Sequence, residues 1–178
     1  MSGIYLGLGG NLGSVARTFG TALEHFEQTS WFRVLRSSQL WRSPSWGFDG
    51  PDFLNAVVEI QTTHSPHELL HALLAYEIQC GRVRGEGMGS RPIDLDLLAW
   101  ADRRVDDPGL TLPHPGTPSR RFVLEPLHDL APELSLTPSA SVGQLVLKAR
   151  LSDPHVSVIQ DSDNWRSWST WDLERRAS

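Results

Sequence analysis

Hydrophobic and polar residues alternate along some stretches of the chain with the period of a strand, and along others with the period of a helix. The predicted strands cover residues 4–9, 32–41, 53–61 and 91–100, and the predicted helices cover residues 14–28 and 65–81. The second helix begins with Ser65-Pro66-His67-Glu68, a capping box with proline at the first helical position. The order βαββαβ with short connections predicts an α/β (α+β) fold, in which an antiparallel sheet has helices packed on one face.

The pattern is weaker beyond residue 100. Residues 112–115 predict a loop, residues 120–127 a short helix and residues 142–149 one more small helix. From about residue 152 the chain is polar except for Trp165, Trp168 and Trp171, whose spacing of three places them on one stripe of a helix. We therefore predict a single domain over residues 1–150 and a C-terminal extension over residues 151–178. The tryptophans of the extension either pack on the domain, which we favour, or meet a partner such as a second copy.

Composition and charge narrow the class of protein. The chain has 178 residues, of which 39% are hydrophobic, and a net charge of −5, which argues against broad nucleic-acid binding. Its apolar runs are all shorter than the roughly 20 residues needed to cross a bilayer. The single cysteine, Cys80, fits a reducing compartment and a small buried side chain. We predict a cytoplasmic monomer that acts on small molecules, without a membrane or nucleic-acid partner.

Two carboxylates stand out in the strand at residues 91–100. Side chains of a strand alternate between its faces, so Ile93, Leu95 and Leu97 point one way, and Asp94 and Asp96 the other. Alpha carbons two residues apart lie roughly 6.5–7 Å from each other, so both acids can share one or two cations, and magnesium prefers such oxygen ligands. The alternative is a strand with one wet face and two acids without a role.

Basic residues surround this acidic pair along the chain. Arg82, Arg84 and Arg91 precede it, and His114 and Arg120 follow it. Carboxylates that hold magnesium, together with guanidinium groups that bind phosphate oxygens, are what phosphoryl transfer requires. The acidic pair is therefore interpreted as a catalytic site.

Other motifs are less informative. Residues 7–13 (GLGGNLG) fail the dinucleotide fingerprint, because Leu12 stands where the third glycine is needed, and they lack the Gly-Lys-Ser/Thr of a P-loop. We interpret them as a turn from a strand to a helix. His64, His67 and His71 lie on or beside one helix, but no cysteine or acid cluster accompanies them as metal ligands.

Several motifs occur in order and at fitting intervals: residues 53–56 (FLNA), 81–84 (GRVR), 91–96 (RPIDLD), 112–115 (LPHP) and 120–127 (RRFVLEPL). With them, the chain resembles the 6-hydroxymethyl-7,8-dihydropterin pyrophosphokinases of folate biosynthesis over roughly residues 3–135. The resemblance implies a ferredoxin-like α/β sandwich, which agrees with the predicted βαββαβ order. It also implies that ATP gives its β,γ-pyrophosphoryl group to the hydroxymethyl oxygen of the pterin, releasing AMP.

The resemblance also implies roles for particular residues. Arg82, Arg91, Asp94 and Asp96 would be catalytic, and Asp94 and Asp96 would bind two Mg²⁺ ions with ATP. The residues implied for ATP binding are Glu77, Arg84, His114 and Arg120. The residues implied for pterin binding are Ser43, Pro44, Trp46, Phe53, Asn55 and Phe122, with Phe122 stacking on the ring.

The chain departs from the family pattern in the loop before the acidic strand. Met88 stands where the family usually has tryptophan, and Gly85, Gly87 and Gly89 make the loop costlier to order. This leaves a catalytically weak or inactive homologue, which binds pterin and nucleotide, as one alternative. A ferredoxin-like interaction or RNA-binding module is another, but such a module exposes aromatic residues on basic strands, whereas this strand carries two acids.

Overall fold

The computed structural model describes residues 3–45, 47–82, 89–153, 155–159 and 165–167, and its centre is an antiparallel sheet. The strands of this sheet are β1 (Ile4–Gly10), β2 (Phe32–Ser37), β3 (Trp41–Ser43), β4 (Phe53–Thr62), β5 (Asp94–Trp100) and β10 (Ser157–Val158). Their order is β10-β3-β4-β1-β5. Strand β3 pairs with the N-terminal part of β4, and β2 pairs with its C-terminal half. The predicted antiparallel sheet is thereby confirmed.

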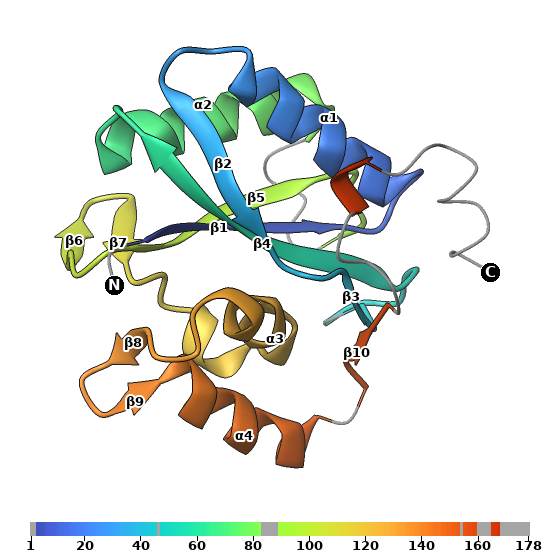
Figure 1. The fold of residues 1–178 in the computed structure, drawn as a ribbon. Helices are drawn as coiled ribbons and strands as arrows, with labels where there is room; N and C mark the ends of the chain where they lie inside the picture. The colour runs from blue at the N-terminus through green and yellow to red at the C-terminus, as the bar shows by residue number, and fades with distance from the viewer. Residues whose placement is uncertain (1–2, 46, 83–88, 154, 160–164, 168–178) are drawn as a thin grey trace.

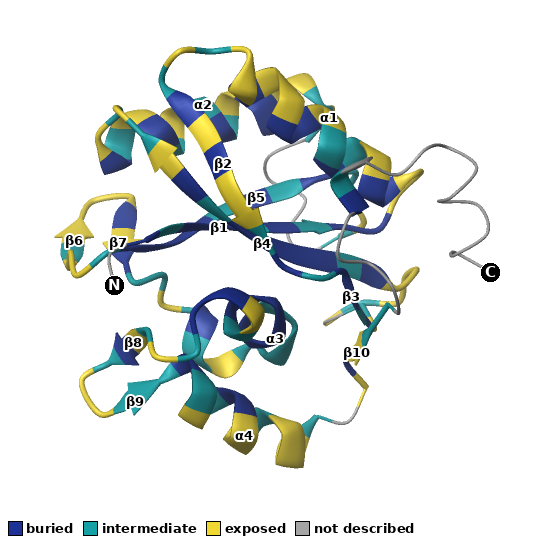
Figure 2. Ribbon diagram, in the orientation of Figure 1, coloured by how far each residue is buried: buried dark blue, intermediate teal, exposed yellow. Residues whose placement is uncertain are grey.

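Helices cover both faces of this sheet (Figure 1). Helices α1 (Val15–Glu27) and α2 (Pro66–Gln79) lie on one face, as predicted for the βαββαβ unit. Helices α3 (Arg121–Leu130) and α4 (Val142–Ser152) lie on the opposite side of the sheet, and α3 is the nearer of the two. Figure 2 shows that the surfaces of the helices and strands that face one another are buried.

The sequence forms these elements for local reasons. Ser65 Oγ accepts a hydrogen bond from the Glu68 backbone N–H, and the Glu68 carboxylate accepts one from the Ser65 backbone N–H, so the predicted capping box is present. Strand β5 alternates as predicted, because Leu95 and Leu97 belong to the core under α1 and α2. Leu98 instead belongs to a second core with α3.

One predicted strand is wrong. Within residues 32–41, β2 ends at Ser37 and β3 begins only at Trp41, and the two strands pair with different parts of β4. The break lies at Ser38, whose backbone N–H donates to Val57 O and whose Oγ accepts from Val57 N–H. Beyond the break, Gln39 N–H and Trp41 Nε1 both donate to Asp129 of α3, which draws the chain toward that helix.

Short elements were not predicted. Strands β6 (Val105–Asp107) and β7 (Leu110–Leu112) form one hairpin, and β8 (Ser135–Thr137) and β9 (Ala140–Ser141) form another. A single 3₁₀ turn, η1 (Thr117–Ser119), precedes α3. Each has three residues or fewer, which is too short to show a hydrophobic period.

The C-terminal residues return to the sheet. Strand β10 pairs with β3, and the 3₁₀ turn η2 (Trp165–Ser167) lies against α1. Trp165 is only 1% exposed, whereas Trp168 and Trp171 lie outside the described residues, so the predicted stripe stays a prediction. The boundary at residue 150 also stays a prediction.

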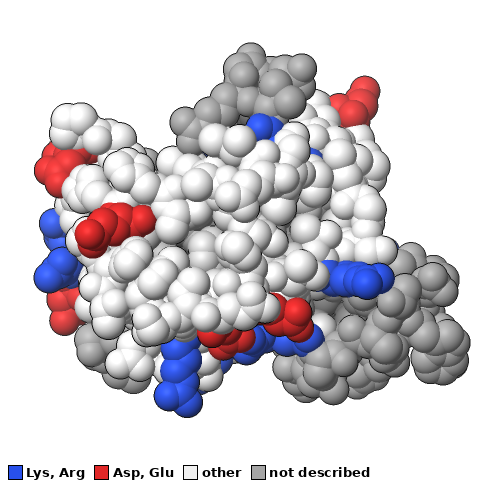
Figure 3. All heavy atoms as spheres, turned by 90° about the horizontal axis from the view of Figure 1, so that it is seen from above, with Lys and Arg blue, Asp and Glu red and all other residues white. Residues whose placement is uncertain are grey.

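The described helices include none that is long and apolar enough to span a membrane. Viewed from the side of α1 and α2, the described charged side chains lie mostly toward the edges of the molecule (Figure 3). Basic side chains do not gather into one continuous patch in that view.

Candidate active site

Asp94 of β5 lies in a row of residues that crosses four strands, and Asp96 lies opposite Gly7 on the same face. Asp94 is opposite Gly9 of β1, Gly9 is opposite Asn55 of β4, and Asn55 is opposite Trp41 of β3. Residues directly opposite one another in a sheet point to the same face, and here it is the face that carries α3. A Cβ at Gly9 would lie 3.7 Å from Asn55 Oδ1 and 3.8 Å from Asp94 Cβ, so the glycine leaves the space between them open.

A pocket lies on this face, between the sheet and the start of α3. It brings together most of the residues that the resemblance implied, from four separate parts of the chain. The predicted site residues that line it are Ser43, Pro44, Phe53, Asn55, Arg91, Asp94, Asp96, Arg120 and Phe122. Glu77, Arg82 and His114 are described but do not line it, and Trp46 and Arg84 lie outside the described residues, as does Met88.

Two arginines hold Asp94 at the edge of the pocket. Arg82 Nη1 lies 2.5 Å from Asp94 Oδ1, and Arg91 Nη2 lies 2.9 Å from Asp94 Oδ2. The Arg91 guanidinium also stands 5.6 Å from the centre of the Phe53 ring, within the range of a cation–π contact. The Asp94 carboxylate thus pairs with two guanidinium groups, and one of them lies beside the Phe53 ring. This arrangement is suited to an anionic ligand.

Glu77 supports this arrangement from beneath. It is 1% exposed, its Oε1 accepts a 2.6 Å hydrogen bond from Leu95 N–H, and its Oε2 lies 2.6 Å from Arg82 Nη1. Burial raises the pKa of Glu77 to about 6, although the bond from Leu95 and the charge of Arg82 oppose the rise. Glu77 is therefore linked to Asp94 of the pocket through Arg82, and direct ATP binding by Glu77 stays a prediction.

Asp96 lies two residues beyond Asp94 in β5, and both line the pocket. Burial raises the pKa of the Asp96 carboxyl, and the neighbouring charge of Asp94 raises it further, while His114 and Arg120 lower it. Two carboxylates this close destabilise each other's charge until a cation joins them. This electrostatic situation is the one that the predicted metal site requires.

The donor set fits magnesium together with a phosphate. Among the described residues, no three His, Cys, Asp or Glu side chains gather as a metal site, so Asp94 and Asp96 are the carboxylates offered here. Magnesium often takes one or two protein carboxylates and completes its shell with water and substrate phosphate. Arg91 lines the pocket, and its Nε is buried without a hydrogen-bond partner among the described atoms.

The sequence did not predict roles for Phe48, which lines the pocket, or for Asn11, which supports one of its residues. Phe48, in the loop after β3, lines the pocket and packs edge-on against Phe53. Asn11, 7% exposed, accepts a 2.8 Å hydrogen bond from Arg91 N–H through Oδ1, and its own N–H donates to Arg91 O. Asn11 thus fixes the backbone of Arg91, and the Gly9-Gly10-Asn11 turn was the one local signal for it.

The comparisons with known proteins agree with this geometry. The family model of 7,8-dihydro-6-hydroxymethylpterin-pyrophosphokinase (HPPK) matches residues 5–132. The chain belongs to this family. The family resemblance found in the sequence is confirmed, and with it the prediction of an ATP-dependent pyrophosphokinase, a transferase.

Named relatives in the HPPK family cover most of the chain. The 2-amino-4-hydroxy-6-hydroxymethyldihydropteridine pyrophosphokinase of Methylorubrum extorquens is 44% identical over 135 residues, which are 75% of this chain and 85% of that protein. The protein of the same name from Pseudomonas aeruginosa is 38% identical over 144 residues, which are 80% of this chain and 89% of that protein.

Solved HPPK structures share the fold. An HPPK-DHPS in complex with substrates superposes with a TM-score of 0.69 at 12% identity, over 85% of this chain and 44% of that one. A Plasmodium falciparum HPPK-DHPS with pterin and p-hydrobenzoate gives 0.67 at 14% identity, over 89% of this chain and 45% of that one. The chain thus spans less than half of these longer proteins, and the predicted ferredoxin-like fold is confirmed.

Proposed function

We propose that the pocket between β1, β3, β4, β5 and α3 is where this HPPK transfers pyrophosphate from ATP to 6-hydroxymethyl-7,8-dihydropterin in folate biosynthesis. A bond forms between the hydroxymethyl oxygen and the β-phosphorus of ATP, and the bond from that phosphorus to the α,β-bridging oxygen breaks. The hydroxymethyl proton is released to water, and AMP leaves with the bridging oxygen. The observation that carries this proposal is the pairing of Asp94 and Asp96 on one face with Arg82 and Arg91 beside them.

The phosphate side of the pocket would be built on charge. Asp94 and Asp96 would hold two magnesium ions, which when bound neutralise the triphosphate and make its β-phosphorus more electrophilic. Arg82 and Arg91 pair with Asp94 in the structure, and phosphate oxygens would compete with that carboxylate for their guanidinium groups. Arg120, on the pocket wall, and His114 and Arg84 would bind the rest of the nucleotide.

The pterin side would be built on aromatic and amide groups. Phe53 and Phe122 both line the pocket, and the flat ring of the pterin would stack on them. Asn55 is 5% exposed, and its Nδ2 donates a 3.0 Å hydrogen bond to Ser43 Oγ. This bond fixes the amide, so that its oxygen can accept a hydrogen bond from an amino or ring N–H group of the pterin.

The activity is tested by AMP release from ATP with magnesium, with and without the pterin. Pterin-dependent AMP is the expected result. If ATP and pterin bind and no AMP forms, the alternative of an inactive binding protein replaces the proposal; the comparisons do not favour that alternative. Titration of magnesium in the same assay tests the number of ions, and sedimentation tests the predicted monomer. The cytoplasmic location also stays a prediction.

The assignment of the pterin wall predicts a selective loss in Phe122→Ala. We expect the KM for the pterin to rise about tenfold, because a stacking face is removed, while the KM for ATP stays within about twofold. Steady-state kinetics with each substrate varied in turn measure both values. Phe122→Tyr keeps the ring and serves as the matched control. An increase confined to the KM for ATP would contradict the placement of the pterin.

A further inference from the structure

The described part of the C-terminal segment, residues 150–153, 155–159 and 165–167, lies beyond the residues that match the HPPK family. It nevertheless contacts two walls of the pocket, β3 and the start of α3, by different means. These are the walls that carry Ser43 and Phe122. The contacts at each wall indicate what the segment does.

The first wall is β3. Strand β10 places Ser157 opposite Arg42 and Val158 opposite Trp41, and Ile159 N–H donates a 2.8 Å hydrogen bond to Leu40 O. Helix α4 ends at Ser152, and β10 begins five residues later as the outer partner of β3 in the sheet order.

A buried tryptophan adds to this attachment. Trp165 Nε1 donates a 2.8 Å hydrogen bond to Ser38 O, and its ring meets Phe19 of α1 edge-on at 6.0 Å. Ser38 directly follows the end of β2 at Ser37, where the path toward β3 begins. The segment therefore contacts residues 38–42, directly before Ser43, by backbone pairing and by one buried indole.

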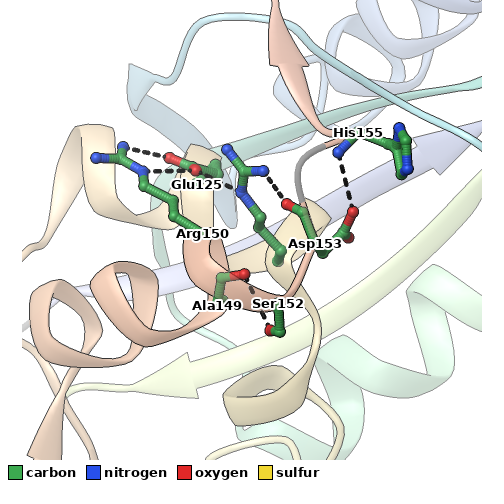
Figure 4. Close-up of polar contacts among 7 residues, drawn as sticks. Glu125, Ala149, Arg150, Ser152, Asp153 and His155 are labelled. Atoms are coloured by element: carbon green, nitrogen blue, oxygen red, sulfur yellow. Dashed lines mark hydrogen bonds and ion pairs between the residues drawn. The ribbon is translucent and has the colours of Figure 1, made fainter.

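The second wall is the start of α3. Arg121 lies between Arg120 and Phe122 in sequence, and its guanidinium group donates to the Asp153 carbonyl oxygen and, at 2.8 Å, to Glu125 Oε1. Figure 4 shows Arg150 of α4 reaching the same carboxylate, with bonds of 2.8 and 2.6 Å to the two oxygens of Glu125. Glu125 is fully buried, so it joins the start of α3 to the C-terminal segment.

Each wall belongs to a short or terminal part of its element, which contacts outside the pocket must hold in place. Strand β3 has three residues and pairs with only three residues of β4, so without β10 it would be a short edge strand. Phe122 stands in the first turn of α3, where helices fray unless other contacts hold them. The position of each wall relative to the other therefore depends on contacts outside the pocket.

We infer that the C-terminal segment positions the pterin site by holding β3 and the first turn of α3, with Trp165 and Arg121 as the main positioning residues. This inference rests on the proposed placement of the pterin between Ser43, Asn55 and Phe122. It gives residues beyond the family match a role in substrate affinity, in addition to their share of the folding energy.

Two substitutions in the full chain test the inference. Trp165→Phe removes the hydrogen bond to Ser38 O and keeps a ring against Phe19, and Arg121→Met removes the bonds to Asp153 and Glu125. We expect each to raise the KM and the Kd for the pterin about fivefold, and Trp165→Phe to leave the KM for ATP within about twofold. Pterin binding is measured by calorimetry with a non-hydrolysable MgATP analogue, well below the unfolding midpoint of each variant.

Matched controls separate positioning from stability. Trp31→Phe alters an indole that stacks on His64, beyond the end of β4 opposite to the pocket, and Arg104→Met removes bonds to the Ser135 and Leu136 carbonyls. We expect these controls to lower stability without raising the KM for the pterin. The inference is overturned if the test variants and the controls have the same pterin KM.

Phe122→Ala distinguishes this failure from failure of the proposed site. If Phe122→Ala weakens pterin binding and Trp165→Phe and Arg121→Met do not, only the positioning role is wrong. If Phe122→Ala has no effect on pterin binding, the proposed pterin wall itself is wrong, and the inference falls with it.

Discussion

Asp96→Asn is expected to lower kcat/KM for AMP formation by about a thousandfold, with Asp94→Asn similar. An asparagine keeps the size of each side chain and removes the charge that binds magnesium. The folded state should not suffer in Asp96→Asn, because burial and the charge of Asp94 already raise the pKa of the Asp96 carboxyl. We therefore expect a variant that is as stable as the parent protein, or more stable, and nearly inactive.

The measurement is pterin-dependent AMP release, with the free energy of unfolding determined on the same preparations. Asp106→Asn is the matched control, since Asp106 is exposed on β6 and does not line the pocket. Asp94→Asn should also loosen Arg82 and Arg91, because both pair with that carboxylate. A tenth or more of the parent activity in Asp96→Asn would contradict the assignment of Asp96 as a metal ligand.

The floor of the pocket could be predicted from the sequence because its signal is local. Alternation along a strand has a period of two. That Asp94 and Asp96 lie on one face of β5 and Leu95 on the other therefore needs no knowledge of the rest of the fold. The capping box of α2 is local in the same way. The roles of Asn55 and Phe122 came from the resemblance to HPPK, and the structure brings both to the pocket without testing those roles.

Contacts between distant residues could not be predicted in this way. The break between β2 and β3 depends on Ser38 bonding to Val57 and on Trp41 bonding to Asp129, 88 residues away. A hydrophobic period does not record such partners. Nor does it show that Glu77, on one side of β5, shares Arg82 with Asp94 on the other. Tertiary contacts of this kind decide how the site is held, and the structure supplies them.

Glu125→Gln should produce the largest loss of stability among the polar substitutions considered. Glu125 is fully buried and accepts hydrogen bonds from Arg121 and Arg150, and Arg121 is itself only 11% exposed. Removal of the charge leaves Arg121 with a neutral partner in a buried place, which costs on the order of 3 kcal/mol. Urea unfolding at neutral pH measures this loss. Glu59→Gln is the matched control, because its partner Arg36 is 53% exposed, and it should cost about 1 kcal/mol or less.

The loss of stability in Glu125→Gln should also depend on pH. Burial alone would raise the pKa of Glu125, but the hydrogen bonds from Arg150 and Arg121 outweigh it and hold the pKa below its ordinary value of 4.5. A carboxyl whose pKa is lowered in the folded state stabilises the fold above the unfolded value and loses that contribution as the pH falls through the folded value. The difference in unfolding free energy between the parent protein and Glu125→Gln should therefore be full at pH 7 and shrink below about pH 4.5. A difference that stays constant across this range would show that Glu125 contributes through packing, and that its charge does not hold Arg121 beside Phe122.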